Sequence, residues 1–362
     1  MRVIVSAGGT GGHIYPALAL INKIKEKEPN SEFIFIGTHN RMEKDIVPKQ
    51  GIKYIPLTII GLERKLTLRN IKTFSYFFRA IKESKRIIEK FNPDIVIGFG
   101  GYVSGPVLYA AKKKGYPTLI HEQNSILGLS NRFLIKYVDA LAISFKDTLN
   151  YVPDDKKIVF TGNPCSEMAL KEPKMDKSKL GLTENKKLIL IVMGSLGSEI
   201  ITKKMKKQLQ LFNNKEYEVL FITGYDYYEE FKDLSLASNI KIVPYIEGLS
   251  SLLKNATLIV SRAGATIISE IIALKIPTIF IPSPYVVNNH QVRNALELVN
   301  KKAALMINEK ELEGDLLVRE IDELLQDTKK YQQMKDNLEK LMIKDSATKI
   351  YDLAKTVIDR SN

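Results

Sequence analysis

Cysteine and tryptophan are almost missing from this sequence, which has one cysteine, Cys165, and no tryptophan. A single cysteine cannot form an internal disulfide, and it cannot build a zinc site that needs several cysteines. The four histidines are not spaced as metal ligands; they are His13, His39, His121 and His290. The sequence therefore predicts no disulfide framework, no metal and no cofactor.

Long hydrophobic runs are missing as well. No uncharged apolar stretch reaches the ~18 residues that would cross a bilayer, and the apolar residues at the N-terminus give way to glycine too early for a signal peptide. We therefore expect a cytoplasmic protein. The charge is unbalanced, with 54 Lys and Arg residues against 41 Asp and Glu residues and a net charge of +13. Such an excess suits nucleic acid, a membrane surface or an acidic substrate, and composition leaves all three open.

The apolar residues that are present form short runs that alternate with amphipathic stretches of helical length, over 362 residues. This alternation is typical of βαβ units and parallel sheets, and the length suggests two domains. The predicted strands are 2–6, 33–37, 53–57, 94–98, 117–120, 139–143 and 157–160, then 188–193, 218–223, 240–243, 257–260 and 277–281. Residues 166–187 read as a polar linker and the approach to a second unit. We predict an α/β fold of two doubly wound domains that face each other across a cleft.

Three glycine-containing turns follow predicted strands. They are Gly-Gly-Thr-Gly-Gly-His at 8–13, Gly-Phe-Gly-Gly-Tyr-Val-Ser-Gly-Pro at 98–106 and Met-Gly-Ser at 193–195. Glycine permits a tight turn, and the helix N-terminus after the turn favours an anion such as a diphosphate. A dinucleotide site would need an acidic residue about 20 positions after the first loop. The second strand ends without a carboxylate, so we discount NAD and retain an anionic nucleotide.

Polar side chains follow other predicted strands. Glu270 falls early in the helix after the strand at 257–260, where a carboxylate can accept hydrogen bonds from two ribose hydroxyls. His-Glu-Gln-Asn at 121–124 and Asn-Asn-His-Gln at 288–291 offer groups suited to sugar hydroxyls. The alternatives are a solvated helix glutamate, a capping cluster and a plain polar loop. No Asp-x-Asp follows a strand, so helix N-termini and Arg262 are expected to stabilise a departing phosphate.

Five segments, read in order, resemble the MurG family of bacterial peptidoglycan N-acetylglucosaminyltransferases. They are residues 8–13, 100–106, 121–124, 162–164 and 262–265, within a resemblance that runs from residue 1 to about 350. The resemblance implies a GT-B fold with two Rossmann-like domains. The first, at 1–163 with a C-terminal helix at about 345–362 packing back on it, would serve the acceptor and membrane, and the second, at 164–344, would bind UDP-GlcNAc.

The reaction that the resemblance implies is an inverting, metal-free transfer of GlcNAc from UDP-GlcNAc. The acceptor is the MurNAc 4-hydroxyl of lipid I, an undecaprenyl-diphosphate-linked muramyl pentapeptide, and the product is lipid II of peptidoglycan synthesis. The implied contacts to UDP-GlcNAc are Thr10, Gly11, Gly12, Asn124, Ser195, Ile246, Ala265, Thr266, Ile267, Ile268, Ser269, Glu270 and Gln291. The implied acceptor-diphosphate contacts are Gly101, Tyr102 and Ser104. The base is His13 or Glu122, and the sequence does not choose between them.

Two positions depart from the family pattern. Ser166 stands where the family usually has an arginine, and Leu196 replaces a glutamine of the third glycine turn. We retain Ser166 as a donor-site position. We expect Ser166→Arg to leave the fold intact and to lower or preserve the KM for UDP-GlcNAc.

The basic charge is concentrated between residues 61 and 90, where nine basic and three acidic residues give a balance of +6. On a helical wheel the basic residues share an arc, beside more aromatic and aliphatic residues than a buried stripe requires. This composition predicts a patch that binds an anionic membrane surface, made of Phe74, Phe77, Phe78, Arg79, Lys82 and Arg86. Lys112, Lys113 and Lys114 would extend it. The alternative is a buried helix with a solvated basic edge.

The resemblance also implies a location, because lipid I is anchored in the cytoplasmic leaflet. We expect a peripheral protein on the cytoplasmic face of the cell membrane, with other cell-wall synthesis proteins as further partners. The alternative function is a different GT-B enzyme that transfers a UDP-sugar to another membrane lipid. Nucleic-acid binding is discounted, because the basic residues are interleaved with aliphatic ones and no nucleic-acid-binding signature is present.

Overall fold

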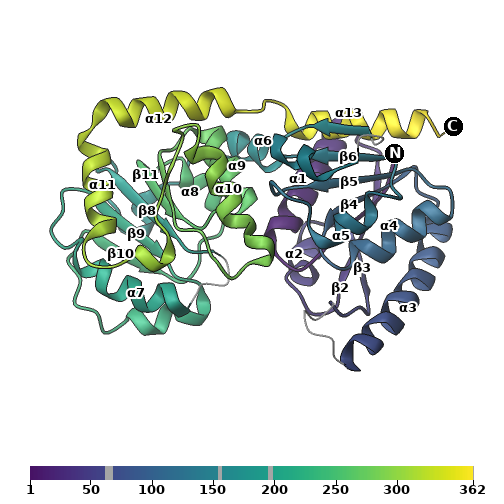
Figure 1. Ribbon diagram of the computed structural model, residues 1–362, viewed down its shortest axis with the longest axis horizontal. Helices are drawn as coiled ribbons and strands as arrows, with labels where there is room; N and C mark the ends of the chain where they lie inside the picture. Colours follow the sequence, from purple (N-terminus) through teal and green to yellow (C-terminus); the bar gives the residue numbers. More distant parts are fainter. Residues whose placement is uncertain (62–67, 154–156, 195–198, 362) are drawn as a thin grey trace. The chain divides into compact units, whose positions relative to one another are not determined.

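The computed structural model describes residues 1–361 apart from 62–67, 154–156 and 195–198. The chain forms two compact units. Unit 1 contains Met1–Glu167 and Ile343–Asn362, and unit 2 contains Met168–Met342. The chain therefore passes from one unit to the other twice, and its last helix belongs to unit 1 (Figure 1).

Unit 1 is built around a seven-stranded parallel sheet in the order β3-β2-β1-β4-β5-β6-β7. Its strands are β1 (Arg2–Ala7), β2 (Glu32–Thr38), β3 (Lys53–Leu57), β4 (Ile95–Gly100), β5 (Thr118–Glu122), β6 (Ala140–Ile143) and β7 (Lys157–Phe160). All seven predicted strands are confirmed, with small shifts at their ends. The strand order reverses between β1 and β4, and sheets of this kind bind ligands at that point, outside the carboxyl ends of the strands.

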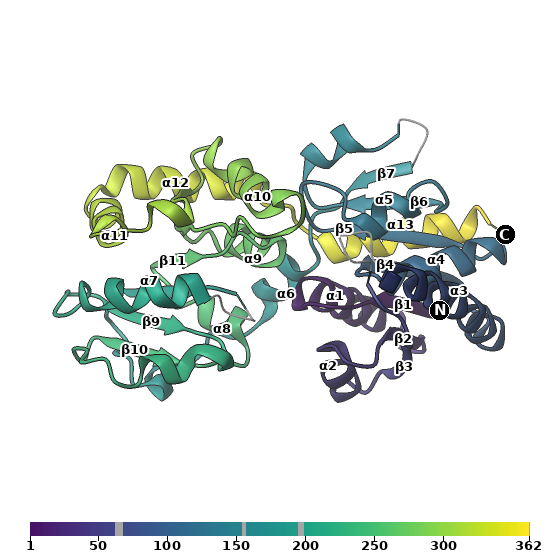
Figure 2. The same cartoon turned by 60° about the horizontal axis from the view of Figure 1, so that its bottom comes forward.

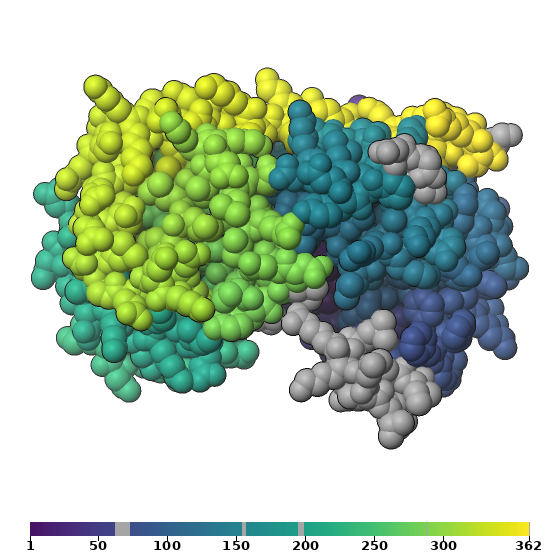
Figure 3. Space-filling model, in the orientation of Figure 1, coloured from purple at the N-terminus to yellow at the C-terminus, as the bar shows by residue number. Residues whose placement is uncertain are grey.

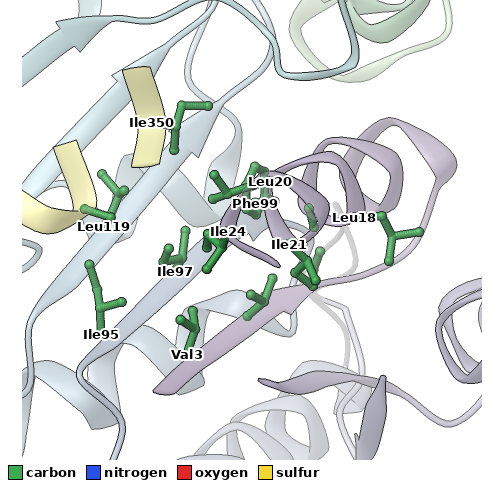
Figure 4. Close-up of a cluster of buried hydrophobic side chains, with 14 of the residues drawn as sticks. Val3, Leu18, Leu20, Ile21, Ile24, Ile95, Ile97, Phe99, Leu119 and Ile350 are labelled. Atoms are coloured by element: carbon green, nitrogen blue, oxygen red, sulfur yellow. The ribbon is translucent and has the colours of Figure 1, made fainter. Parts of the chain in front are cut away.

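Helices cover both faces of this sheet (Figure 2). They are α1 (Gly11–Lys27), α2 (Glu43–Lys49), α3 (Leu68–Phe91), α4 (Ser104–Lys113), α5 (Leu129–Leu134), the 3-10 helix η1 (Lys146–Tyr151) and α13 (Ser346–Asp359). On one face, Leu20 of α1 and Ile350 of α13 pack with Val3, Ile97 and Leu119 of the strands (Figure 4). Buried residues of α3, α4 and α5 form a second cluster on the other face.

Unit 2 has a six-stranded parallel sheet in the order β10-β9-β8-β11-β12-β13. Its strands are β8 (Leu188–Val192), β9 (Glu218–Ile222), β10 (Ile240–Val243), β11 (Leu258–Ser261), β12 (Thr278–Phe280) and β13 (Leu305–Met306). Its helices are η2 (Lys177–Leu180), α7 (Glu199–Gln210), η3 (Tyr225–Phe231), α8 (Leu249–Leu253), α9 (Ala265–Leu274), η4 (Val287–Asn289), α10 (His290–Val299), η5 (Glu309–Glu311), α11 (Leu316–Gln326) and α12 (Thr328–Leu341). Each unit is therefore a doubly wound, Rossmann-like α/β domain, as the sequence predicted.

Short elements in two places were not predicted. The segment at 166–187, predicted as a linker and the approach to the second unit, contains η2 and most of α6 (Cys165–Lys171). The buried apolar residues of α6 are Cys165 and Ala169. Two apolar residues among polar ones do not form a clear helical pattern in the sequence, so the helix was missed. β13 was not predicted, because a two-residue strand is too short to show an alternating pattern.

Candidate functional site

The glycine loops that follow β1 and β4 touch each other at the carboxyl end of the unit 1 sheet. Gly101 has a φ of +80°, and a Cβ there would lie 2.3 Å from Gly8 O, so only glycine fits. Ser104 Oγ lies 2.9 Å from Ser6 O and 2.8 Å from Gly100 O, and the residue is fully buried. The Ser104 hydroxyl therefore ties the two loops together.

His13 lies in the first turn of α1, next to both loops. Its Nδ1 lies 3.0 Å from Gly8 O. Because a carbonyl oxygen can only accept a hydrogen bond, Nδ1 carries the proton of the neutral ring and Nε2 carries the lone pair. The ring packs over Gly100, where a Cβ would lie 3.1 Å from Nε2. The histidine is therefore held in one orientation and one tautomer by the loops themselves.

The other predicted residues of these loops are accessible. Thr10 is exposed, and Gly11, Gly12, Gly101 and Tyr102 are half-buried. Thr10 precedes α1 in an extended conformation, and its side chain makes no capping hydrogen bond. The unit 1 site thus combines accessible backbone at the start of a helix with an oriented imidazole, an arrangement that suits an anion next to a proton acceptor.

Glu43, at the start of α2, lies beneath the first glycine loop and is 0% exposed. Its Oε2 accepts a hydrogen bond from Gly9 N at 3.2 Å, and its Oε1 accepts from Thr38 N at 3.0 Å and from Thr38 Oγ1 at 2.6 Å. Sequence reasoning missed this residue. Gly9 is 34 positions away, so no local motif marks the contact.

Glu122, at the end of β5, is 1% exposed, and both of its carboxylate oxygens are engaged. Oε1 accepts hydrogen bonds from Asn124 N at 3.0 Å and Asn124 Nδ2 at 3.1 Å, and Oε2 accepts from Gly128 N at 2.8 Å and Asn131 Nδ2 at 2.9 Å. These bonds shape the segment that leads into α5. A base must reach its substrate, so the geometry favours His13 over Glu122 for proton removal.

Asn124, predicted to contact the donor sugar, is half-buried beside this network. Its Nδ2 is committed to Glu122, and its backbone oxygen accepts a hydrogen bond from Thr148 Oγ1 at 3.1 Å. The residue is therefore well fixed in position.

His121 is a fully buried structural residue. Its Nε2 donates to Gly162 O at 3.0 Å, and its Nδ1 lies 3.1 Å from Gln123 Nε2, which also donates to Phe99 O at 2.8 Å. Burial lowers the pKa of His121 to about 4, although the hydrogen bond to Gly162 O opposes this shift. His121 is therefore neutral at neutral pH and joins the ends of β4 and β5 to the segment at 162–164.

Glu270 is a buried carboxylate in α9 of unit 2, with 7% of its surface exposed. Its Oε1 accepts a hydrogen bond of 2.6 Å from Ser250 Oγ in α8. Burial raises the pKa of Glu270 to about 7, and the bond from Ser250 opposes this rise. Sequence reasoning missed Ser250, which lies 20 positions away and belongs to no motif.

The other predicted donor contacts of unit 2 differ in accessibility. Thr266, Ile267 and Ser269 are half-buried, whereas Ala265 and Ile268 are buried. Ile268 has 0% exposure and its N–H donates to Gly264 O. Ile246 follows β10 and is 8% exposed, so recognition there falls to its backbone. Ser195 lies outside the described residues.

Gln291 and Arg262 use their side chains differently. Gln291 Oε1 accepts a hydrogen bond from Ser283 N at 2.8 Å, which leaves the amide nitrogen as the group to donate to a sugar hydroxyl. Arg262 is 6% exposed. Its Nη1 donates to Ile281 O at 3.0 Å, and its Nη2 pairs with Glu309 Oε2 at 2.5 Å. The expected role of Arg262 toward a departing phosphate is therefore corrected, because its guanidinium is held inside unit 2.

Ser166 belongs to unit 1 and is 7% exposed. Its Oγ donates to Asn163 O at 2.8 Å and lies 3.2 Å from Ser346 Oγ, at the start of α13. The serine hydroxyl is thus hydrogen-bonded within unit 1.

An exposed hydrophobic surface, which we call the aromatic patch, lies on α3 and α5. It consists of Phe74 (55% exposed), Phe78 (66%), Leu129 (64%) and Phe133 (40%). The half-buried Phe77 connects the two helices, with ring centroids 6.2 Å from Phe78 and 6.1 Å from Phe133. The contribution of α5 was not expected, because six residues are too few to show a hydrophobic period.

The basic residues beside the aromatic patch are Arg79, Lys82 and Arg86, and all three are exposed. The expected extension by the lysines of α4 is weaker than its sequence suggests. Lys112 pairs with Asp139 at 2.5 Å, Lys114 pairs with Glu89, and Lys113 Nζ lies 5.7 Å from the centre of the Tyr109 ring.

The part of the chain that the structure describes contains neither a metal-binding cluster nor a membrane-spanning helix. No three His, Cys, Asp or Glu residues gather there as a metal site would require. No helix among the described residues is both long enough and apolar enough to cross a bilayer.

Known proteins match this chain along almost its whole length. Residues 3–143 match the glycosyltransferase family 28 N-terminal domain, and residues 188–357 match the C-terminal domain of that family. A Bacillus cereus protein, named UDP-N-acetylglucosamine--N-acetylmuramyl-(pentapeptide) pyrophosphoryl-undecaprenol N-acetylglucosamine transferase 1, is 46% identical over 365 residues, which cover 99% of this chain and 100% of that protein. A transferase of the same name from Bacillus pumilus is 46% identical over 363 residues, or 99% of each chain.

The solved structures agree with these relatives. Acinetobacter baumannii MurG has a TM-score of 0.75 and 26% sequence identity to this chain, over 98% of this chain and 99% of that one. Two family domains cover both units, and the relatives align from end to end. The chain therefore belongs to glycosyltransferase family 28.

Proposed function

We propose that this chain transfers N-acetylglucosamine from UDP-GlcNAc to lipid I and thereby makes lipid II for peptidoglycan. The observation that carries the proposal is the match over 99% of the chain, at 46% identity, to relatives whose name states this donor, acceptor and transferred group. The two Rossmann-like units, with accessible loops at the carboxyl ends of their strands, suit a nucleotide-sugar donor and a diphosphate-linked acceptor.

Unit 2 binds the donor in this proposal. The buried carboxylate of Glu270, oriented by Ser250, accepts hydrogen bonds from the two ribose hydroxyls of UDP. The backbone at Ile246 pairs with the uracil edge, and the amide nitrogen of Gln291 donates to a GlcNAc hydroxyl. The start of α9, at Ala265 and Thr266, supplies positive helix-dipole potential to the diphosphate.

Unit 1 binds the acceptor and supplies the base. The backbone of the two glycine loops and Tyr102 hold the lipid I diphosphate, and His13 Nε2 takes the proton of the MurNAc 4-hydroxyl. As this oxygen forms its bond to C1 of GlcNAc, the bond from C1 to the diphosphate breaks, and UDP leaves with the electron pair. Attack from the opposite side inverts the configuration at C1. Glu122 supports the site by shaping the segment that carries Asn124.

The aromatic patch brings the enzyme to its lipid-anchored acceptor. Aromatic side chains beside exposed Arg79, Lys82 and Arg86 match a surface that lies on an anionic bilayer. The protein is then peripheral, on the cytoplasmic face of the cell membrane.

Incubation with UDP-[labelled GlcNAc] and lipid I tests the function. Labelled lipid II is the expected product, and His13→Ala should lower kcat by about 100- to 10,000-fold, the usual contribution of a general base. A parallel reaction offers undecaprenyl diphosphate lipids that lack MurNAc. Label in those lipids and none in lipid II would overturn the proposal in favour of a UDP-sugar transferase for another membrane lipid.

A further inference from the structure

One peptide group in unit 1 is held at both of its polar ends. The carbonyl oxygen of the Gly8–Gly9 peptide accepts a hydrogen bond from His13 Nδ1 at 3.0 Å, and the N–H of the same peptide donates to Glu43 Oε2 at 3.2 Å. The N–H and C=O of a peptide lie in one plane and point in opposite directions. A buried carboxylate is therefore joined to an imidazole through a single amide.

The carboxylate of Glu43 is itself held firmly. Thr38 donates two hydrogen bonds to Oε1, and Tyr54 OH donates to Thr38 O at 2.5 Å. Among the described residues, the donors to this carboxylate are Gly9 N, Thr38 N and Thr38 Oγ1, and all three are neutral groups. A Cβ on Gly8 would lie 2.8 Å from Glu43 Oε1, and a Cβ on Gly37 would lie 2.7 Å from Glu43 Cγ. Both glycines thus leave the space through which the carboxylate reaches the loop.

We propose that Glu43 is a positioning residue for His13, acting through the Gly8–Gly9 peptide; this inference rests on His13 being the base of the proposed function. By fixing the N–H of that peptide, Glu43 aims Gly8 O at Nδ1, which keeps the ring proton there and the lone pair on Nε2. Its negative charge also polarises the amide, so that the carbonyl oxygen stabilises a charged imidazole better.

The proton balance of the step is simple. The MurNAc 4-hydroxyl gives its proton to Nε2 as the C1–O bond forms and UDP leaves, and Nδ1 keeps its own proton on Gly8 O. The imidazolium then carries one positive charge, with the Glu43 carboxylate one peptide away. Glu43 is not on the path of the proton, because its oxygens contact the Gly9 N–H and not the ring.

Kinetics of three variants separate this role from simple support of the loop. Glu43→Gln keeps the size of the side chain and removes its charge, and it should lower kcat by about 10- to 100-fold, the usual cost of losing a partner that orients a functional histidine. The KM for UDP-GlcNAc should change less than kcat, because most of the proposed donor contacts lie in unit 2. The double variant His13→Ala/Glu43→Gln should be no slower than His13→Ala alone, since Glu43 acts only through His13. Losses that multiply in the double variant would overturn the proposal.

Glu218→Gln in unit 2 is a matched control. Glu218 is 4% exposed, and like Glu43 it accepts hydrogen bonds from the backbone N–H of a threonine, at 2.9 Å, and from the Oγ1 of that threonine, at 2.8 Å. Glu218→Gln therefore removes a carboxylate that is buried and hydrogen-bonded like that of Glu43 but is not bonded to either glycine loop. The kcat of this variant should stay within about twofold of the wild-type value. A fall as large as that of Glu43→Gln would overturn the proposal.

Nitrogen-15 NMR of histidine-labelled protein reports the tautomer without any need for activity. The chain has four histidines, and His13→Ala identifies the signal of His13 by its disappearance. The wild-type ring should carry its proton on Nδ1, and Glu43→Gln should populate both tautomers. An unchanged tautomer in folded Glu43→Gln would overturn the proposal. If Glu43→Gln does not fold, Thr38→Val, which removes one hydrogen bond to the carboxylate and leaves its charge, should give a smaller change in the same direction.

The two proposals fail in different ways. A wild-type protein that makes no lipid II would sink the proposed function, while the NMR measurement would still decide whether Glu43 sets the tautomer of His13. Full activity of His13→Ala would show that His13 is not the base and would overturn the inference.

Discussion

Among single residues, Glu270 and His121 show how burial favours the uncharged form of a side chain. Desolvation is the largest cause of both pKa shifts, upward for the carboxyl group and downward for the imidazole. Their partners differ, however. His121 has hydrogen-bond partners at both ring nitrogens, whereas Glu270 has one hydroxyl, Ser250, so that its carboxylate retains the capacity to accept more hydrogen bonds.

We expect Glu270→Gln to weaken the binding of UDP-GlcNAc and to raise the free energy of unfolding at pH 8. Below its ordinary pKa of 4.5 the carboxyl group is protonated in both states, but between 4.5 and about 7 only the folded state holds the proton. The free energy of unfolding therefore falls as pH rises through this window. The variant should be more stable than the wild type at pH 8 by about 1–3 kcal/mol, and its KM for UDP-GlcNAc should rise by about 10- to 100-fold. Urea unfolding at pH 5 and pH 8 measures the first effect, and parallel stability curves for the two proteins would contradict it.

His121 is expected to make unit 1 sensitive to acid. Its pKa is about 4 in the folded state and 6.5 when unperturbed, so between these values only the unfolded state gains the proton. Stability is therefore lost as pH falls from 6.5 toward 4. His121→Gln, which can still donate to Gly162 O, should flatten this loss. The exposed His39 provides the control, and a His39→Gln protein should keep the acid loss of the wild type.

Residues whose side chains turn inward mark the limit of prediction from sequence. The motifs that suggested the site include or adjoin Ser104, Ser166 and Arg262. The polar side-chain atoms of these three residues bind partners within their own unit. Sequence position places a residue next to a site but does not tell which way its side chain points. Glu43 and Ser250 were missed for the complementary reason, because their partners are distant along the chain.

At the scale of elements, strands were predicted more reliably than short helices. The central strands β1, β4 and β8 contain runs of buried apolar residues, because helices cover both faces of a parallel sheet, and such runs are easily recognised in a sequence. α5 and α6 have six and seven residues, fewer than two full turns, so their patterns are ambiguous. Missing α5 matters for function, because this helix carries half of the aromatic patch.

The aromatic patch leads to a binding prediction. Phe78→Asp places a charge at its most exposed ring and should weaken sedimentation with phosphatidylglycerol vesicles by about 10-fold or more, because burying a carboxylate in the interface is costly. Phe77 is a poorer choice, since it is packed between Phe78 and Phe133. UDP-GlcNAc binding should not change.

Leu211→Asp is the matched control for this experiment. Leu211 is also an exposed hydrophobic residue, with 43% of its surface accessible, but it lies in unit 2 just after α7. Its substitution should leave vesicle binding intact. Equal losses in the two variants would remove the assignment of the membrane surface to α3 and α5.

At the scale of the whole molecule, unit 1 is assembled from both ends of this chain. α13 lies at the surface, drawn in yellow in Figure 3, yet Ile350, Ala354 and Val357 are buried in the core that α1 and the sheet share. Tyr351 OH also donates to Glu28 Oε1 at 2.8 Å, at the end of α1. The last helix therefore closes one face of the first sheet.

Ile350→Ala tests how strongly α13 holds unit 1. Ile350 is 0% exposed, so truncation to alanine should lower the free energy of unfolding by about 2–5 kcal/mol. Lys349→Ala, at an exposed neighbouring position on the same helix, should change it by less than about 0.5 kcal/mol. Urea unfolding followed by circular dichroism measures both. A similar effect of the two substitutions would show that α13 is dispensable to the core.

The double passage between units also sets an order for protein synthesis. Unit 2, Met168–Met342, leaves the ribosome as one continuous stretch, whereas unit 1 receives α13 only after all of unit 2 has been made. Until then the nascent first sheet exposes the apolar face that includes Val3, Ile97 and Leu119. Unit 1, which is started first, can therefore complete its core only after unit 2 has been made, and a chain cut after residue 342 would keep all of unit 2 beside a first sheet that is open to chaperones and proteases.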